Sequence, residues 1–156
     1  MYNITLVNTG YEVMASGIFA AVLAQVLKVL LYILVNKKIN FKIITTTGGM
    51  PSSHSAGVCA LATSVCIICG FDSIPFAIAA GYAIVVMYDA AGVRRAAGKT
   101  AATLNRLVRD LSEQNKEPNP YEVLKELLGH TPKEVLCGAL LGIAVAFSFH
   151  ALLSLL

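Results

Sequence analysis

The sequence predicts an all-α membrane protein: a polytopic bundle of about four transmembrane helices with one amphipathic helix at its cytoplasmic face. The 156-residue chain is 56% hydrophobic and only 13% charged, with a mean hydropathy of +0.70, whereas soluble domains carry about 25% charged residues. Its apolar residues gather in long runs, and its basic residues gather between alternate runs. A chain of this length fits one domain, so residues 1–156 are expected to form a single integral membrane domain.

Four apolar runs approach or exceed the roughly 20 helical residues that cross a bilayer. They cover Val13–Val35, Ser55–Phe71, Ile74–Ala91 and Val135–Leu156. The second and third runs are short, so we expect them to span with little tilt or to extend into the flanking loops. No basic leader precedes the first run, so no cleavable signal peptide is predicted.

The distribution of charge predicts the orientation of the chain. Every Lys and Arg except Lys28 falls in residues 36–54 or 92–134, whereas Glu12 and Asp72 mark the opposite ends of the runs. The positive-inside rule then places both polar segments, and every candidate site residue within them, on the cytoplasmic side. The net charge of +3 and the lack of a basic stripe interleaved with aromatics predict no nucleic-acid partner.

The segment after the third run predicts an amphipathic helix, Val93–Leu111. Its apolar residues recur at three- and four-residue steps, and basic residues occupy the opposite side. The prolines and asparagines of Asn115–Pro120 predict a turn. A short helix over Tyr121–Leu128 is then expected to end at Gly129, a residue suited to the position after a helix.

A polar stretch, GGMPSSHSA at residues 48–56, lies between two strongly apolar segments. Pro51 can start a helix whose first amides are unpaired, and such an N-terminus binds anions through free N–H groups and the helix dipole. Ser52 and Ser53 would add hydroxyl donors, and a protonated His54 in the first turn could donate a proton to a leaving oxygen. A capped helix with an interfacial histidine explains the same residues equally well.

A second histidine, His130, precedes the last apolar run in GHTPKEV, residues 129–135. It can attack phosphorus if a carboxylate orients its ring, and Glu134 lies four residues on. Taken alone, the motif favours a structural explanation. Thr131 would be an N-cap, Pro132 would occupy the first turn, and Glu134 would complete a capping box.

Several charged residues could surround a phosphate. Arg94 and Arg95 suit a phosphate because a guanidinium binds two oxygens at once, and Lys99 shares a helical face with Arg95. The alternative is that these cations only set topology near lipid headgroups. Lys28 lies in the middle of the first run and would face the interior, to reach the phosphate or pair with Asp89, or would snorkel to the surface. Asp89 could orient an arginine. One carboxylate is little basis for a metal, and no metal or cofactor is predicted.

Two other patterns resemble motifs without their context. Cys66 and Cys69 form a C-x-x-C, but all four cysteines lie in apolar runs, where small packed thiols are expected. Residues 92–100 resemble a nucleotide-binding P-loop, but five residues separate its two glycines where that motif has four. Neither redox chemistry nor nucleotide hydrolysis is therefore predicted.

Three blocks together resemble the divergent branch of the type-2 phosphatidic acid phosphatase superfamily, which is related to acid phosphatases and vanadium-dependent haloperoxidases. They are GGMPSSHSA, MYDAAGVRRAAGK and LLGHTPKEV, at residues 48–56, 87–99 and 127–135. The resemblance implies a phosphohistidine intermediate formed without metal. In that scheme His130 is the nucleophile, Glu134 orients it, and His54 is the acid for the leaving group.

The blocks also depart from the superfamily's pattern. Ser53 replaces a glycine, and Glu134 replaces an aspartate. The superfamily places an arginine seven residues after its first lysine and another six residues before its nucleophilic histidine, but those positions here are Val35 and Leu124. The cations of the third block, Arg94, Arg95 and Lys99, would have to replace these charges.

The sequence therefore predicts a lipid phosphatase at the cytoplasmic leaflet, acting on a prenyl diphosphate, a phosphatidic acid or a phosphatidylglycerophosphate. The alternative is a non-catalytic membrane protein that binds an anionic lipid or scaffolds partners. A transporter or channel subunit lined by Lys28 and Asp89 is a weaker third hypothesis. Four short spans would leave a thin bundle, which is compatible with a homo-oligomer.

Overall fold

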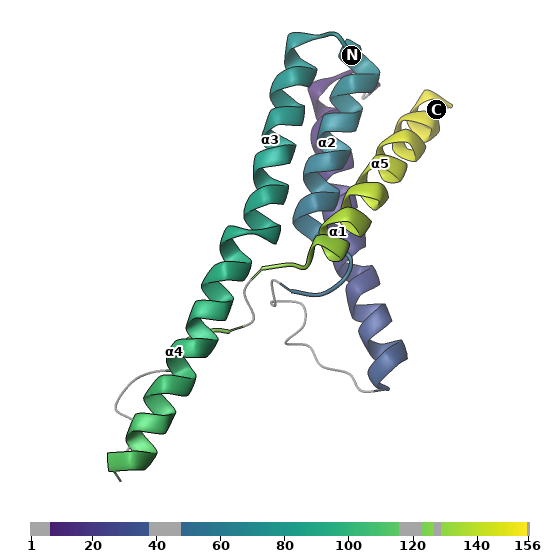
Figure 1. Cartoon of the computed structure of the whole chain (residues 1–156). Helices are drawn as coiled ribbons and strands as arrows, with labels where there is room; N and C mark the ends of the chain where they lie inside the picture. The colour runs from purple at the N-terminus through teal and green to yellow at the C-terminus, as the bar shows by residue number, and fades with distance from the viewer. Residues whose placement is uncertain (1–6, 38–47, 116–122, 127–128, 156) are drawn as a thin grey trace.

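A computed structural model describes residues 7–37, 48–115, 123–126 and 129–155. All regular secondary structure within these ranges is α-helical (Figure 1). The helices are α1 (Gly10–Asn36), α2 (Ser53–Cys69), α3 (Ile74–Ala91), α4 (Val93–Asn115) and α5 (Pro132–Ser154). The predicted all-α class is confirmed, and each of the four apolar runs forms a helix close to its expected limits.

Within the described ranges, three helical stretches are long and apolar enough to cross a membrane. They are Gly10–Asn36, Ile74–Gln114 and Pro132–Ser154, of which the second combines α3 with nearly all of α4. The fourth apolar helix, α2, is shorter at 17 residues. Large apolar side chains such as Leu34 and Ile78 are mostly exposed, as expected for helices that face lipid.

The shorter helix α2 is the centre of the bundle, because α1, α3 and α5 all pack against it. Small residues allow these close approaches. A Cβ atom at Gly138 or Gly142 of α5 would collide with the backbone of Ser52 or Ala56. Such contacts between small residues are typical of helix packing in membranes. They bring the N-terminal ends of α2 and α5 together, where both candidate histidines lie.

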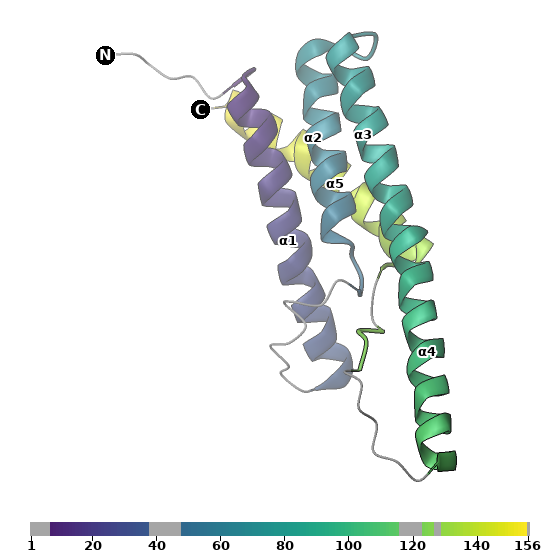
Figure 2. The same cartoon turned by 90° about the vertical axis from the view of Figure 1, so that its left-hand side faces the viewer.

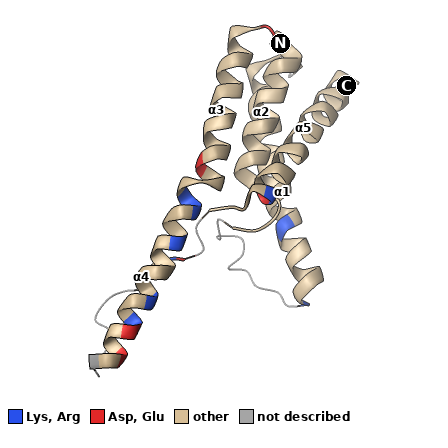
Figure 3. Ribbon diagram, viewed as in Figure 1, with Lys and Arg blue, Asp and Glu red and all other residues tan. Residues whose placement is uncertain are grey.

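The amphipathic helix predicted from Val93 is present as α4, and only Gly92 separates it from α3. It runs on from α3 away from the bundle (Figures 1 and 2). Its lysines and arginines lie toward the end of the bundle opposite the start of α1 and the end of α5 (Figure 3). The charge asymmetry of the sequence is thus an asymmetry of the folded molecule.

The short helix predicted over Tyr121–Leu128 is wrong where it can be compared, because residues 123–126 are not helical. Asn105 of α4 forms the hydrogen bonds that the backbone of Leu124 would otherwise form within a helix. The side-chain Nδ2 of Asn105 donates to the carbonyl oxygen of Leu124 at 2.8 Å, and its Oδ1 accepts from the Leu124 backbone amide at 3.0 Å. The remaining residues of that prediction, and most of the predicted turn at 115–120, lie outside the described part of the chain.

Candidate active site

His130 is held rigidly between α3 and α5. Its backbone amide donates to the carbonyl oxygen of Ala90 at 2.9 Å. The preceding Gly129 has φ +84°, and a Cβ atom there would collide with the backbone of Arg94 and Arg95. The turn before α5 therefore requires glycine, and this turn fixes the histidine against the junction of α3 and α4.

One ring nitrogen of His130 has a hydrogen-bond partner among the described residues, and the other has none. The residue is 3% exposed. Its Nδ1 lies 3.2 Å from Oε2 of Glu134, and its Nε2 is buried with no hydrogen-bond partner among the described residues. If Nδ1 carries the proton that the carboxylate accepts, the neutral ring has its lone pair on Nε2. A buried nitrogen with an unused lone pair is suited to attack an electrophile.

Glu134 performs both tasks that the sequence suggested as alternatives. The capping box is present, with Thr131 Oγ1 accepting from the Glu134 amide at 3.4 Å. Glu134 Oε2 in turn accepts from the Thr131 amide at 3.0 Å, and the same oxygen faces His130. The start of α5 and the orientation of the imidazole therefore depend on one carboxylate.

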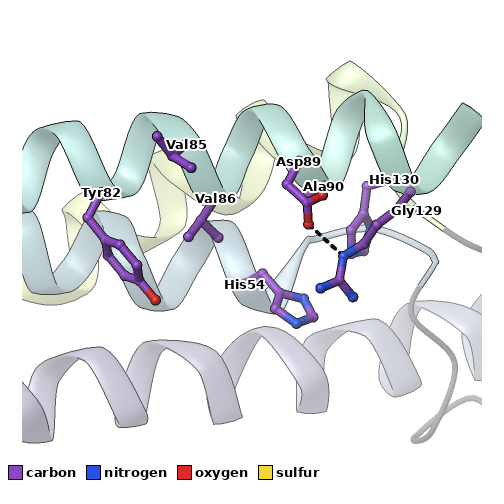
Figure 4. A pocket seen from close by; sticks show the side chains of 9 residues that line it. His54, Tyr82, Val85, Val86, Asp89, Ala90, Gly129 and His130 are labelled. Atoms are coloured by element: carbon purple, nitrogen blue, oxygen red, sulfur yellow. Dashed lines mark hydrogen bonds and ion pairs between the residues drawn. The ribbon is translucent and has the colours of Figure 1, made fainter.

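His54, in the first turn of α2, brings a second imidazole to the same place. The centroids of the His54 and His130 rings are 6.2 Å apart, and their planes meet at 63°. Both rings line a cavity of about 330 Å³. Figure 4 shows His54 pointing into the space in front of His130, with Asp89 and Val86 of α3 alongside. Two histidines that are 76 positions apart in the sequence thus converge on one cavity.

Arg94 supplies a cation at the cavity wall. Its Nε donates to Oδ2 of Asp89 at 2.7 Å, and both residues line the cavity (Figure 4). Because this bond uses Nε, the two terminal guanidinium nitrogens are left for an anion. Asp89 therefore pairs with Arg94, and the alternative in which it pairs with Lys28 is wrong.

Lys28 approaches the site from inside the bundle. It is 4% exposed, and its stem lies against the backbone of Gly49, where a Cβ atom would be 3.3 Å from Lys28 Cδ. Its charge acts electrostatically on Glu134 and on both histidines. Lys28 thus faces the interior and does not snorkel outward.

Burial is the main influence on the protonation of His130. It lowers the pKa of the imidazole, and the charge of Lys28 lowers it further, while the hydrogen bond to Glu134 opposes both effects. The net pKa lies below the ordinary value of 6.5. His130 is therefore mainly neutral at neutral pH, which is the form in which it could act as a nucleophile.

The remaining predicted site residues do not line this cavity, and neither do Lys28 and Glu134. α2 begins at Ser53, not at Pro51. Ser52 is its N-cap and is fully buried, and Ser52 Oγ accepts from the amide and hydroxyl of Ser55. Ser53 lines a neighbouring groove. Arg95 and Lys99 are exposed on α4 and do not line the cavity between the histidines.

Besides Val85, Ala90 and Gly129, two further lining residues were missed in the sequence, Tyr82 and Val86 of α3. They precede Asp89 by seven and three residues, so all three share one face of the helix. Listing the positions three and seven residues before Asp89 on the same helical face would have identified both residues. Among the described residues, no group of three or more His, Cys, Asp or Glu side chains could hold a metal ion.

The fold and the apolar helices define an integral membrane protein with a cavity at one end of its bundle that is lined by two histidines. The chain belongs to the Divergent PAP2 family, which it matches over residues 9–145. It is 44% identical over 137 residues to the uncharacterized membrane protein YuiD of Bacillus subtilis (strain 168), covering 82% of this chain and 87% of that protein. No solved structure matches it. The resemblance inferred from the three sequence blocks is confirmed.

Proposed function

We propose that the protein is a lipid phosphatase that removes a phosphate from a lipid phosphate or diphosphate monoester through a phosphohistidine on His130. One observation carries this proposal. Nε2 of His130 is buried and unpartnered beside a second histidine, while Nδ1 is held by Glu134. A buried polar atom without a partner is costly in a folded protein, so its persistence at a cavity wall suggests a role there.

In the first step, Nε2 of His130 would attack phosphorus, and the bond from phosphorus to the leaving oxygen would break. His54 would give that oxygen a proton, so the lipid product leaves as a neutral alcohol or as a monophosphate. Glu134 would stabilise the positive charge that develops on the His130 ring. Proton donation of this kind contributes roughly 10²–10⁴-fold to the rate.

In the second step, water would attack the phosphohistidine. His54, neutral after the first step, would take a proton from that water. The N–P bond would break, releasing inorganic phosphate and restoring neutral His130. Both imidazoles line the same cavity of about 330 Å³, in which the phosphoryl group would lie. No metal is required by this scheme.

Arg94 and Lys28 would neutralise the phosphate and stabilise the charge of the transition state. Asp89 would position the Arg94 guanidinium through its 2.7 Å bond. Preorganised donors aimed at developing charge are often the largest catalytic contribution, at about 3 kcal/mol each. Arg95 and Lys99 are exposed outside the cavity, so we assign them no contact with the phosphate.

The site would face the cytoplasm, because Arg94 at the start of the basic helix α4 (Figure 3) lines the cavity together with both histidines. On this view residues 1–156 act as one domain, and the apolar helices hold the site at the level where lipid phosphates lie. α2 would be a fourth span, short but central.

Phosphate release tests the proposal. Purified protein in detergent micelles is incubated with a prenyl diphosphate, a phosphatidic acid and a phosphatidylglycerophosphate. We expect release from at least one of these lipids, and its loss in His130→Ala. A protein that binds these lipids and releases no phosphate would instead be the non-catalytic anionic-lipid binder. The uncharged side chains at Val35 and Leu124 favour that second candidate.

A further inference from the structure

An apolar groove adjoins the cavity between the histidines. It has a volume of about 480 Å³ and lies between α1, α2 and α3. Three residues, His54, Tyr82 and Val86, line both the cavity and the groove. Figure 4 shows Tyr82 and Val86 following one another along α3 from the position of His54. The cavity and the groove therefore adjoin at these three residues.

The chemistry of the lining changes along this path. The cavity carries Arg94 and Asp89, whereas the groove beyond His54 is lined mainly by apolar side chains such as Ile18 of α1 and Leu61 of α2. Leu61 lies seven residues beyond His54, which is about 10 Å along a helix. The cavity and the groove together thus have a charged end and an apolar end, as a bound amphiphile would require.

The groove is open on the side of the bundle. Ile18 and Met14 on its α1 wall are 62% and 61% exposed, and Tyr82 on its α3 wall is 58% exposed. If α1 and α3 span the bilayer, this side faces lipid. A hydrocarbon chain could therefore enter sideways from the membrane, without passing through water.

We propose that the hydrocarbon chain of the substrate lies in this groove, and that the substrate is a single alkyl or prenyl chain attached directly to its phosphate or diphosphate. This inference rests on the proposed function, because it takes the phosphate to be held between His54 and His130. The apolar lining begins at Val86, next to that phosphate position. A hydrocarbon chain bonded directly to the phosphate would place its first carbons against this apolar lining.

A diacylglycerol phosphate fits the same path less well. It has two ester groups within a few bonds of its phosphate, and those carbonyl oxygens would meet Val86 and Val58. Besides His54 itself, the polar side chains of the groove lining are Ser53 and Tyr82. Polar groups placed against apolar side chains without hydrogen bonds are penalised. The groove thus selects against esters close to the phosphate.

Crosslinking tests the groove without relying on turnover. A dodecyl phosphate with a diazirine in mid-chain is photolysed with the full-length protein in micelles, and the labelled residues are mapped. We expect label on groove residues of α1, α2 and α3, competed by unlabelled dodecyl phosphate and reduced about tenfold by Ile18→Trp. Label spread over lipid-facing residues outside the groove, unaffected by competitor, would overturn the inference.

Phosphate release then separates the two proposals. We expect Ile18→Trp to lower kcat/KM for dodecyl phosphate by about tenfold or more, because one methylene in an apolar pocket can change discrimination by 10- to 200-fold. Butyl phosphate, too short to reach Ile18, should be unaffected. Ile84→Trp, at a lipid-facing position 64% exposed on α3 and outside the groove, is the matched control.

The outcomes are distinct. Label in the groove without phosphate release from any lipid would defeat the proposed function and retain the groove as a chain-binding site. Phosphate release at equal rates from dodecyl phosphate and a diacyl phosphatidic acid, or at a rate unchanged by Ile18→Trp, would overturn the groove assignment. The proposed phosphatase function would remain.

Discussion

Oε2 of Glu134 lies 3.2 Å from Nδ1 of His130, and the same oxygen accepts the Thr131 amide at 3.0 Å. A structural cap and the orientation of a candidate nucleophile thus share one atom. Because the two tasks share an atom, a substitution that removes the carboxylate cannot by itself distinguish them. Paired variants can, and they give the first prediction.

Glu134→Gln should retain the cap, because its amide oxygen can still accept from Thr131, but it removes the negative charge beside His130. We expect kcat for phosphate release to fall by about 10²-fold or more, with little change in the melting temperature. Thr131→Ala should do the reverse, costing about 1 kcal/mol of stability and leaving kcat nearly unchanged. Equal activity in wild type and Glu134→Gln would mean that Glu134 is only a cap.

The pH dependence of the rate should reflect the burial of His130. Its pKa in the folded protein is below 6.5, so the ring stays neutral as the pH falls to that value and is protonated only at lower pH. We therefore expect the acid limb of kcat/KM, which reports on the free enzyme, to lie below pH 6.5. An acid limb above pH 6.5 that persists in His54→Gln would contradict this assignment.

The same shift affects stability, and its sign is fixed. Unfolded His130 binds a proton more readily than folded His130, because burial lowers its folded pKa from 6.5. The neutral buried ring thus contributes stability that is present above pH 6.5 and lost as the pH falls through the folded pKa. The melting temperature of the wild type should fall more steeply below pH 6.5 than that of His130→Gln. Parallel curves would show that His130 is not buried as described.

Arg94 should matter for turnover and little for folding. Arg94→Ala removes a donor at the cavity, so kcat/KM should fall by about 10²–10³-fold, with partial retention in Arg94→Lys. Its ion pair with Asp89 is half-exposed, so the loss of stability should be at most about 1 kcal/mol. Arg95→Ala is the matched control, one residue away but outside the cavity, and should behave as wild type.

The hydrogen-bonded pair of Glu12 and His150 should matter for stability alone. At the other end of the bundle, Oε1 of Glu12 on α1 lies 2.7 Å from Nδ1 of His150 on α5, and the Glu12 side chain is fully buried. His150→Ala would remove one partner of that carboxylate and leave the Asn8 amide, which donates to Oε2 at 2.7 Å, costing about 2 kcal/mol. Ser148→Ala, on the exposed side of α5, is the control. A large loss of activity per folded molecule in His150→Ala would show that this end also takes part in turnover.

The apolar runs were sufficient to predict the helices, because a bilayer-length stretch of nonpolar residues has few alternatives to a helix. The capping box at Thr131 was equally readable, since its partners lie three residues apart. The predicted helix at Tyr121–Leu128 failed in its described part because Asn105, distant in sequence, provides the hydrogen bonds of Leu124. Local pattern carries no information about such a partner.

The site was predictable in its residue types and less so in its contacts. His54, His130 and Arg94 meet at one cavity, but the pairing of Asp89 with Arg94 and the inward course of Lys28 depend on how α1 and α3 pack against α2. The apolar groove depends on the same packing. Spacing within one helix could reveal Tyr82, whereas the distance between two helices could not be read from the sequence.

The central claim is that His130 carries the phosphoryl group, and rapid quenching tests it most directly. The protein is mixed with a lipid phosphate labelled with ³²P, stopped in base within the first turnover, digested and mapped. We predict an acid-labile label on the peptide containing His130 in the wild type, and none in His130→Ala, which should also release no phosphate. Steady phosphate release by His130→Ala, or a label on any other residue, would contradict the account.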